Sequence, residues 1–193
     1  MRVLGEVSPL TSDPSPKGRC AVPYSAKAVA NEFLHLAKNE GRTLTPMQLI
    51  KLVYFAYGWY WAIANDRLLD ERVEAWKYGP VVPSIYHEFK RYGNEPIDGF
   101  ATDFRPLRKD GNLTFFLEEP RIPECDELPN QLIKRVWDVY KGFTAIQLSR
   151  MTHEPGTPWA ETQGKDVKGT DIDDDKIRDY FVQLARHHVP QPA

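Results

Sequence analysis

Residues 45–64 read TPMQLIKLVYFAYGWYWAIA, and this stretch decides the fold. Thr45 is a suitable helix N-cap, and Pro46 follows at the first helical position, where its missing N–H costs no hydrogen bond. From Met47 to Ala64 two apolar stripes run at helical spacing, so most of the circumference is apolar and the helix is expected at the centre of the fold. One stripe comprises Leu49, Leu52, Val53, Ala56, Tyr60 and Ile63, and the other comprises Met47, Ile50, Tyr54, Tyr57 and Trp61.

Further helical patterns lie on both sides of this stretch. One helix is predicted from the Ser25 cap to a stop at Gly41, and another opens at Pro83 and ends at Gly93. Three more are predicted at about 126–140, 144–152 and 173–188.

The strand signals are fewer and shorter. Residues 73–78 alternate with period two and predict a short strand that Gly79-Pro80 breaks. Asp110-Gly111 lies between two apolar runs, 104–107 and 113–117, which is a hairpin pattern. We therefore expect a mainly helical α+β fold around the 45–64 helix, with a small antiparallel sheet made of residues 71–78 and the 101–118 hairpin.

The domain organisation follows from composition. Residues 1–22 are rich in Pro and Ser and lack apolar periodicity, so they are predicted to form a flexible N-terminal tail. Residues 23–193 are then a single domain, a size that can bury a substantial core.

Charge and hydropathy argue against two classes of protein. The net charge of −2 provides no basic field for nucleic acid, and no predicted helix carries the cluster of Arg, Lys, Asn and Gln that groove readout needs. The run Leu52 to Ala64 is uncharged but has 13 residues, whereas a membrane span needs about 20. MRVLGEVSPL lacks the apolar core of a signal peptide, so a cytoplasmic protein with reduced Cys20 and Cys125 is expected.

Candidate catalytic and metal patterns are all incomplete. A zincin needs His four residues after His87, where Arg91 stands. The acidic run 171–175 resembles a calcium loop but has Lys176 at the glycine position, and helix-start acids explain it better. Nothing pairs Cys125 with a His base, and His187-His188 is expected to be a solvated helix end. We therefore predict no catalytic residue, no metal site and no cofactor, and a thiol-dependent hydrolase is kept as an alternative.

Three segments together resemble one known family. They are TPMQLIKLVYFAYGW at 45–59, EAWKYGPVVP at 74–83 preceded by Asp70-Glu71, and THEPGTPW at 152–159. In this order they resemble the Panacea domain, also described as SocA-like or phage-associated GepA-like, over about residues 25–181. Tyr57 stands where the family pattern has His.

The resemblance implies a protein of toxin–antitoxin operons and prophages that acts as an antitoxin. Its expected partner is a cognate protein toxin encoded nearby, which it neutralises by direct protein–protein binding. An alternative is a proteolytic adaptor, which would also bind an ATP-dependent cytoplasmic protease. The chain carries no appended DNA-binding domain, which argues against autorepression.

Aromatic residues are abundant, and they are the candidates for a toxin-binding surface. Trp59, inside the central helix, is expected in the core. For the others two alternatives stand: Trp76 to Pro80 forms a rigid aromatic turn for packing or docking, and His153 and Trp159 form either a structural clamp or a partner contact. The candidate toxin-binding residues are Trp76, Lys77, Tyr78, Gly79, Pro80, His153 and Trp159.

Overall fold

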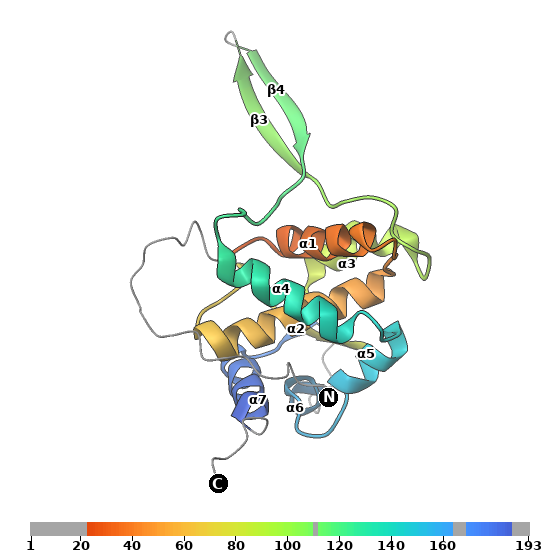
Figure 1. Ribbon diagram of the computed structural model, residues 1–193, viewed down its shortest axis with the longest axis vertical. Helices are drawn as coiled ribbons and strands as arrows, with labels where there is room; N and C mark the ends of the chain where they lie inside the picture. The colour runs from red at the N-terminus through yellow and green to blue at the C-terminus, as the bar shows by residue number, and fades with distance from the viewer. Residues whose placement is uncertain (1–22, 110–111, 164–168, 187–193) are drawn as a thin grey trace.

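The computed structural model describes residues 23–109, 112–163 and 169–186, so the predicted tail at 1–22 lies outside the described residues. α2 (Pro46–Ala64) runs through the middle of the molecule (Figure 1). Every residue from Leu49 to Tyr60 is buried, which confirms the predicted central helix. The helices that pack around it are α1 (Ala26–Asn39), α4 (Glu127–Tyr140), α5 (Ala145–Thr152) and α7 (Asp174–Arg186).

Local signals fix both ends of α2. The Gln48 backbone N–H donates to the Thr45 hydroxyl, and the Thr45 N–H donates to the Gln48 side-chain oxygen at 3.0 Å, which forms a capping box. At the other end Asn65 adopts a left-handed conformation with φ of 50°, a position that Asn tolerates better than most residues. The start predicted from Thr45 and Pro46 is confirmed.

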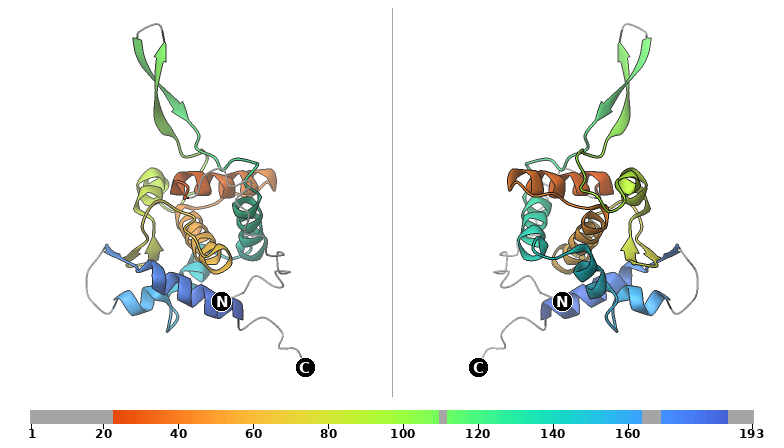
Figure 2. Two further views of the ribbon diagram at one scale, coloured as in Figure 1. Left: turned by 90° about the vertical axis from the view of Figure 1, so that its left-hand side faces the viewer. Right: turned by 90° about the vertical axis from the view of Figure 1, so that its right-hand side faces the viewer.

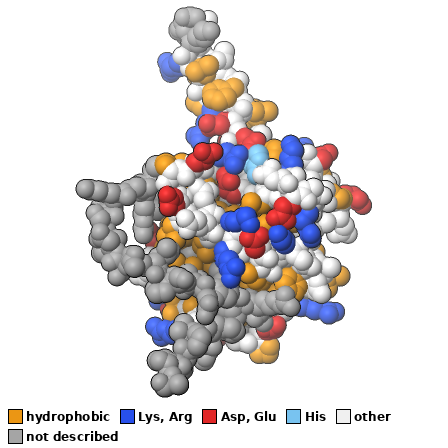
Figure 3. All heavy atoms as spheres, in the orientation of Figure 1, with side chains coloured by type: hydrophobic (Ala, Val, Ile, Leu, Met, Phe, Trp, Pro, Cys, Tyr) orange, Lys and Arg blue, Asp and Glu red, His pale blue; other side chains and the backbone are white. Residues whose placement is uncertain are grey.

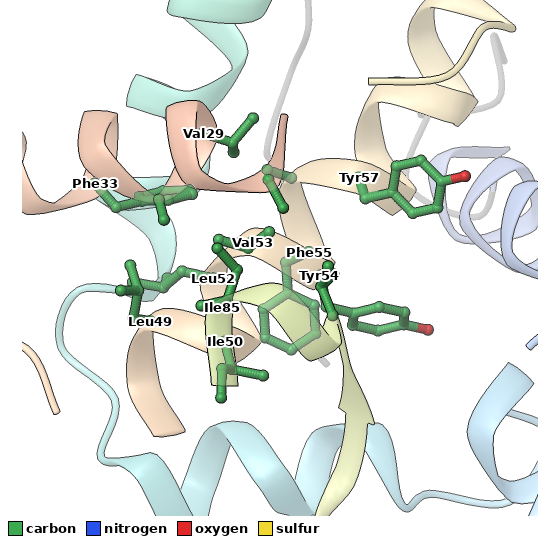
Figure 4. Packing of buried hydrophobic residues seen from close by; sticks show 14 of the residues in the cluster. Val29, Phe33, Leu49, Ile50, Leu52, Val53, Tyr54, Phe55, Tyr57 and Ile85 are labelled. Carbon is green, nitrogen blue, oxygen red and sulfur yellow. The ribbon is translucent and has the colours of Figure 1, made fainter. Parts of the chain in front are cut away.

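One part of the core lies where α1 and α3 (Pro83–Phe89) meet α2. Figure 4 shows Val29 and Phe33 of α1 near Leu52 and Val53, with Ile85 reaching in from α3; all five side chains are buried. Trp59 is also buried, as predicted.

Gly58 sets how closely α7 approaches α2. A Cβ atom at this position would lie 2.1 to 2.5 Å from three ring carbons of Phe181, far inside van der Waals contact. The Phe181 ring is fully buried and packs edge-on against Trp59, with ring centroids 5.3 Å apart. Glycine therefore leaves the space that the Phe181 ring occupies.

The sheets differ from the expectation. β1 (Glu74–Trp76) pairs antiparallel with β2 (Gly79–Val81) and β5 (Thr170–Asp171), whereas β3 (Asp103–Lys109) and β4 (Asn112–Glu118) form a separate two-stranded sheet. The predicted joint sheet of 71–78 with the 101–118 hairpin is therefore wrong. The predicted strand ends before Gly79-Pro80, at Trp76, and these two residues begin β2, an edge strand, where a proline without an N–H is tolerated.

The remaining helices follow the predictions with local differences. The predicted 83–92 helix is α3 followed by a 3-10 turn, η1 (Lys90–Tyr92), that ends at Gly93. α7 begins with Asp174 and Asp175, and Asp173 accepts a hydrogen bond from the Asp175 N–H, so the acids start a helix as expected. The short α6 (Pro158–Gln163) was not predicted, and His187-His188 lies outside the described residues. The mainly helical α+β class is confirmed.

The β3–β4 hairpin projects from the helical body (Figures 1 and 2). Phe104 pairs with Leu117 and Pro106 with Phe115, so these four side chains share one face. All four are exposed, Phe104 at 76%, and apolar side chains stand out on this projection in Figure 3. An isolated two-stranded hairpin is marginally stable in water, so contacts at its base must support it.

Asn31 of α1 contacts the two segments at the base of that hairpin, before β3 and after β4. Its side-chain N–H groups donate to the carbonyls of Ala101 and Pro120, at 3.0 and 2.9 Å, and its side-chain oxygen accepts from the Ala101 N–H at 2.8 Å. The side chain is fully buried, and each of these groups finds a partner.

Candidate binding site

The candidate site centres on the turn between β1 and β2, which we call the aromatic turn and define as residues Trp76 to Pro80. Lys77 and Tyr78 form its two-residue loop, and Tyr78 is 59% exposed. Trp76 is half-buried, while Gly79 and Pro80 are buried. The Lys77 amine lies 5.4 Å from the centre of the Tyr78 ring.

Side chains from segments distant in the sequence contact the backbone of this turn on the side opposite its exposed side chains. Carbonyl oxygens at four of its five residues each lie within hydrogen-bond distance of a side chain. The pairs are Trp159 Nε1 to Trp76 O at 2.8 Å, His153 Nε2 to Lys77 O at 3.4 Å, Ser149 Oγ to Tyr78 O at 2.9 Å and Lys51 Nζ to Pro80 O at 2.9 Å. The exposed side chains of the turn therefore stand on a fixed backbone.

His153 and Trp159 occupy the positions of the predicted structural clamp. His153 Nδ1 lies 2.6 Å from the Ser149 carbonyl oxygen, and its ring centre lies 3.7 Å from that of Trp159. Trp159 is buried, with 9% of its surface exposed. Both residues thus pack behind the aromatic turn. Direct contact of either with a partner stays a prediction.

Gly79 allows the turn to close against α2 and α5. Its φ of 104° is a conformation that L side chains rarely adopt. A Cβ atom there would lie 2.5 Å from Thr152 Oγ1 and 2.6 Å from Lys51 Nζ. A glycine is therefore required here both by the backbone angle and by the space.

A pocket of about 740 Å³ opens beside the aromatic turn. Trp76 and Tyr86 contact each other edge to face in its wall, with ring centroids 4.7 Å apart. Three lysines line it, and none of the described lining residues is Asp or Glu. The lining residues are Pro46, Met47, Ile50, Lys51, Ala75, Trp76, Lys77, Tyr78, Val81, Tyr86, Lys90, Gly93 and Asn94.

Lys51 is the unusual member of this lining. It is 1% exposed, and burial lowers the pKa of its amine from 10.5 to about 7. Within the described part of the chain its amine makes one hydrogen bond, to Pro80 O, and no ion pair. Sequence reasoning assigned Lys51 no role, although it is the only charged residue in the sequence of the 46–64 helix, which was a visible signal.

The catalytic and metal candidates are not drawn together. Cys125 is an exposed free thiol, and Cys20 lies outside the described residues. His87 is exposed and contacts Tyr86. Over residues 23–109, 112–163 and 169–186 no group of three or more His, Cys, Asp or Glu could hold a metal ion. In the same residues no helix is long and apolar enough to cross a membrane.

The sequence that forms these helices and the aromatic turn matches a known class of bacterial protein. Residues 49–160 match the family described as antitoxin SocA-like, Panacea domain, and the chain belongs to this family. A named relative is the Antitoxin SocA of Caulobacter vibrioides (strain NA1000 / CB15N). It is 32% identical to this chain over 179 residues, which cover 90% of this chain and 87% of that protein. No solved structure matches the chain.

Proposed function

We propose that this protein is an antitoxin that neutralises a toxin encoded beside it by direct binding, and that the aromatic turn and its pocket form the docking surface. The observation that carries the proposal is that four carbonyl oxygens of the turn lie within hydrogen-bond distance of side chains packed against it. A surface fixed before binding loses little conformational entropy when a partner docks. Trp and Tyr are also the residues most enriched at binding hot spots.

Within this surface the candidate residues divide into three roles. Lys77 and Tyr78, which are exposed, would contact the toxin, and Trp76 would contribute through the wall of the pocket. His153 and Trp159 would act as positioning residues, because their ring nitrogens face carbonyls of the turn. Gly79 and Pro80 would shape the turn itself.

The family supports the antitoxin role, and its relative in Caulobacter carries that name. We propose no catalytic step. Both ring nitrogens of His153 lie near backbone carbonyls, so this residue is not placed as a free general base. A binding protein of this kind would act in the cytoplasm, where its toxin is made.

Binding of the toxin encoded next to this gene tests the proposal. The purified proteins should form a complex, and co-expression should restore growth that the toxin alone arrests. Tyr78→Ala should raise the Kd about 30-fold, the loss of roughly 2 kcal/mol that defines a hot spot. Its melting temperature should stay close to that of the wild type, because the side chain is mostly exposed.

Phe104→Ala is the matched control, because it removes another exposed aromatic ring, from the projecting hairpin. We expect it to bind the toxin at wild-type affinity. If Phe104→Ala weakens binding while Tyr78→Ala does not, the docking surface is the hairpin and our assignment is wrong. A toxin that stays intact in the complex supports masking, whereas loss that requires an ATP-dependent protease supports the adaptor alternative.

A further inference from the structure

The described lining of the pocket beside the aromatic turn contains basic side chains and no acidic ones. Lys51, Lys77 and Lys90 line it together with the hydroxyl-bearing rings of Tyr78 and Tyr86, and its described lining contains no carboxylate. The protein as a whole has a net charge of −2, so this gathering of amines does not follow from composition. An anionic partner group would find donors here and no competing acid within the lining.

Burying the Lys51 amine costs more free energy of desolvation than is needed to give the Pro80 carbonyl a hydrogen-bond donor. Its amine satisfies Pro80 O with one of three possible N–H donors. A neutral donor would satisfy the same carbonyl without the desolvation penalty of a buried amine. Lys51 nevertheless belongs to the pocket lining, and in surroundings of low dielectric a protonated amine pairs strongly with an anion.

The apolar part of the lining indicates what carries the anion. Met47 and Ile50 join Trp76 and Tyr86 in walls that fit a hydrocarbon or aromatic stem. The volume of about 740 Å³ holds more than one side chain. The pocket also opens beside the exposed turn, the surface on which a protein partner would lie.

We propose that this pocket receives an acidic side chain of the toxin, flanked by an apolar one, and that Lys51 at the pocket wall pairs with its carboxylate. The inference rests on the proposed function, because it names the chemistry by which the same surface recognises its partner. Lys90 and Lys77, both exposed, provide further positive charge at the pocket.

Titration of the neighbouring gene's toxin against two variants tests the pairing. Lys51→Met removes the amine, and Lys51→Gln removes the charge but keeps an N–H donor for Pro80 O. Both should weaken binding about 10- to 100-fold, the usual effect of losing a hydrogen bond to a charged group. Lys134→Met, on the exposed face of α4, is the matched control and should bind as the wild type does. Thermal melts confirm that each variant is folded.

A pair of small molecules tests the pocket without the toxin. 3-Phenylpropionate carries a carboxylate on an aromatic stem, and 3-phenylpropionamide has the same shape without the charge. Chemical shift changes in the spectrum of the wild-type protein should show at least about fivefold tighter binding of the carboxylate, and Lys51→Gln should lose this preference.

The outcomes separate the two proposals. If the toxin binds the wild type and both Lys51 variants equally, or if the carboxylate is not preferred over the amide, the pocket inference is overturned and the antitoxin proposal stands. If the toxin does not bind the wild type at all, the antitoxin proposal fails and the inference fails with it. If Lys51→Met is unfolded, Lys51→Gln and the small-molecule pair decide.

Discussion

Replacing Lys51 with Met converts a buried amine into an apolar side chain, and we expect the resulting change in stability to depend on pH. The pKa of this amine is 10.5 in the unfolded chain and about 7 in the folded protein. Between these values the unfolded chain binds more protons than the folded protein, so the contribution of Lys51 to stability becomes more favourable as pH rises. Below pH 7 the wild type bears the full cost of burying the ammonium group, roughly 4 to 5 kcal/mol.

The methionine variant bears no such cost but leaves the Pro80 carbonyl without its donor, a loss of about 1 to 3 kcal/mol at any pH. We therefore expect it to be more stable than the wild type at pH 6. At pH 10 the advantage should be smaller by about 4 kcal/mol, so that the variant is no more stable than the wild type or less stable.

Urea unfolding of both proteins at pH 6 and pH 10 measures this difference directly. Other groups titrate in this range too, but they are common to both proteins and cancel in the comparison. Lys134→Met reports the effect of removing a charge from an exposed position, and its difference from the wild type should change little with pH. A difference for Lys51→Met that is constant between pH 6 and pH 10 would refute the reasoning, because it would mean that the buried amine does not titrate between these values.

Three further substitutions test the packing described above. Gly58→Ala should lower the free energy of unfolding by about 1 to 3 kcal/mol, because its Cβ meets the Phe181 ring, and Phe181→Leu in the same chain should recover part of the loss in urea unfolding. Trp159→Ala should cost about 3 to 5 kcal/mol in the same assay, in contrast to about 0.5 kcal/mol or less for Tyr78→Ala; similar values for the two would contradict their assignment to clamp and surface. Asn31→Ala should speed hydrogen exchange of the hairpin amides while those of α2 stay protected, and unchanged exchange in the hairpin would show that Asn31 does not support it.

The central helix was predictable because its signals are local. Thr45 and Pro46 mark its start, and its two apolar stripes predict that nearly all its faces are buried, as they are. The sheet was not predictable in the same way, because β5 is only two residues long and pairs with β1 across about a hundred residues. A strand of two residues has no periodicity to detect, and a pairing at that separation is decided by how the helices pack.

The candidate site, too, was predictable only in part. Trp76 to Pro80, His153 and Trp159 were selected as residues, and their proximity follows from contacts that no spacing in the sequence encodes. Lys51 was missed because helix periodicity treats it as one polar position on an apolar helix, whereas its meaning depends on Pro80 and on the pocket beside it.

The clamped turn has a consequence for the order in which this protein becomes able to bind. Three of its four carbonyl contacts join residues 71 to 83 positions apart, and their donors come from residues 149–159. During synthesis the aromatic turn therefore leaves the ribosome long before the side chains that fix it. Until residue 159 has emerged and α5 has packed, the turn lacks most of the side-chain contacts that fix its backbone. A chain cut between α4 and α5 would keep every exposed residue of the turn and still lack the surface.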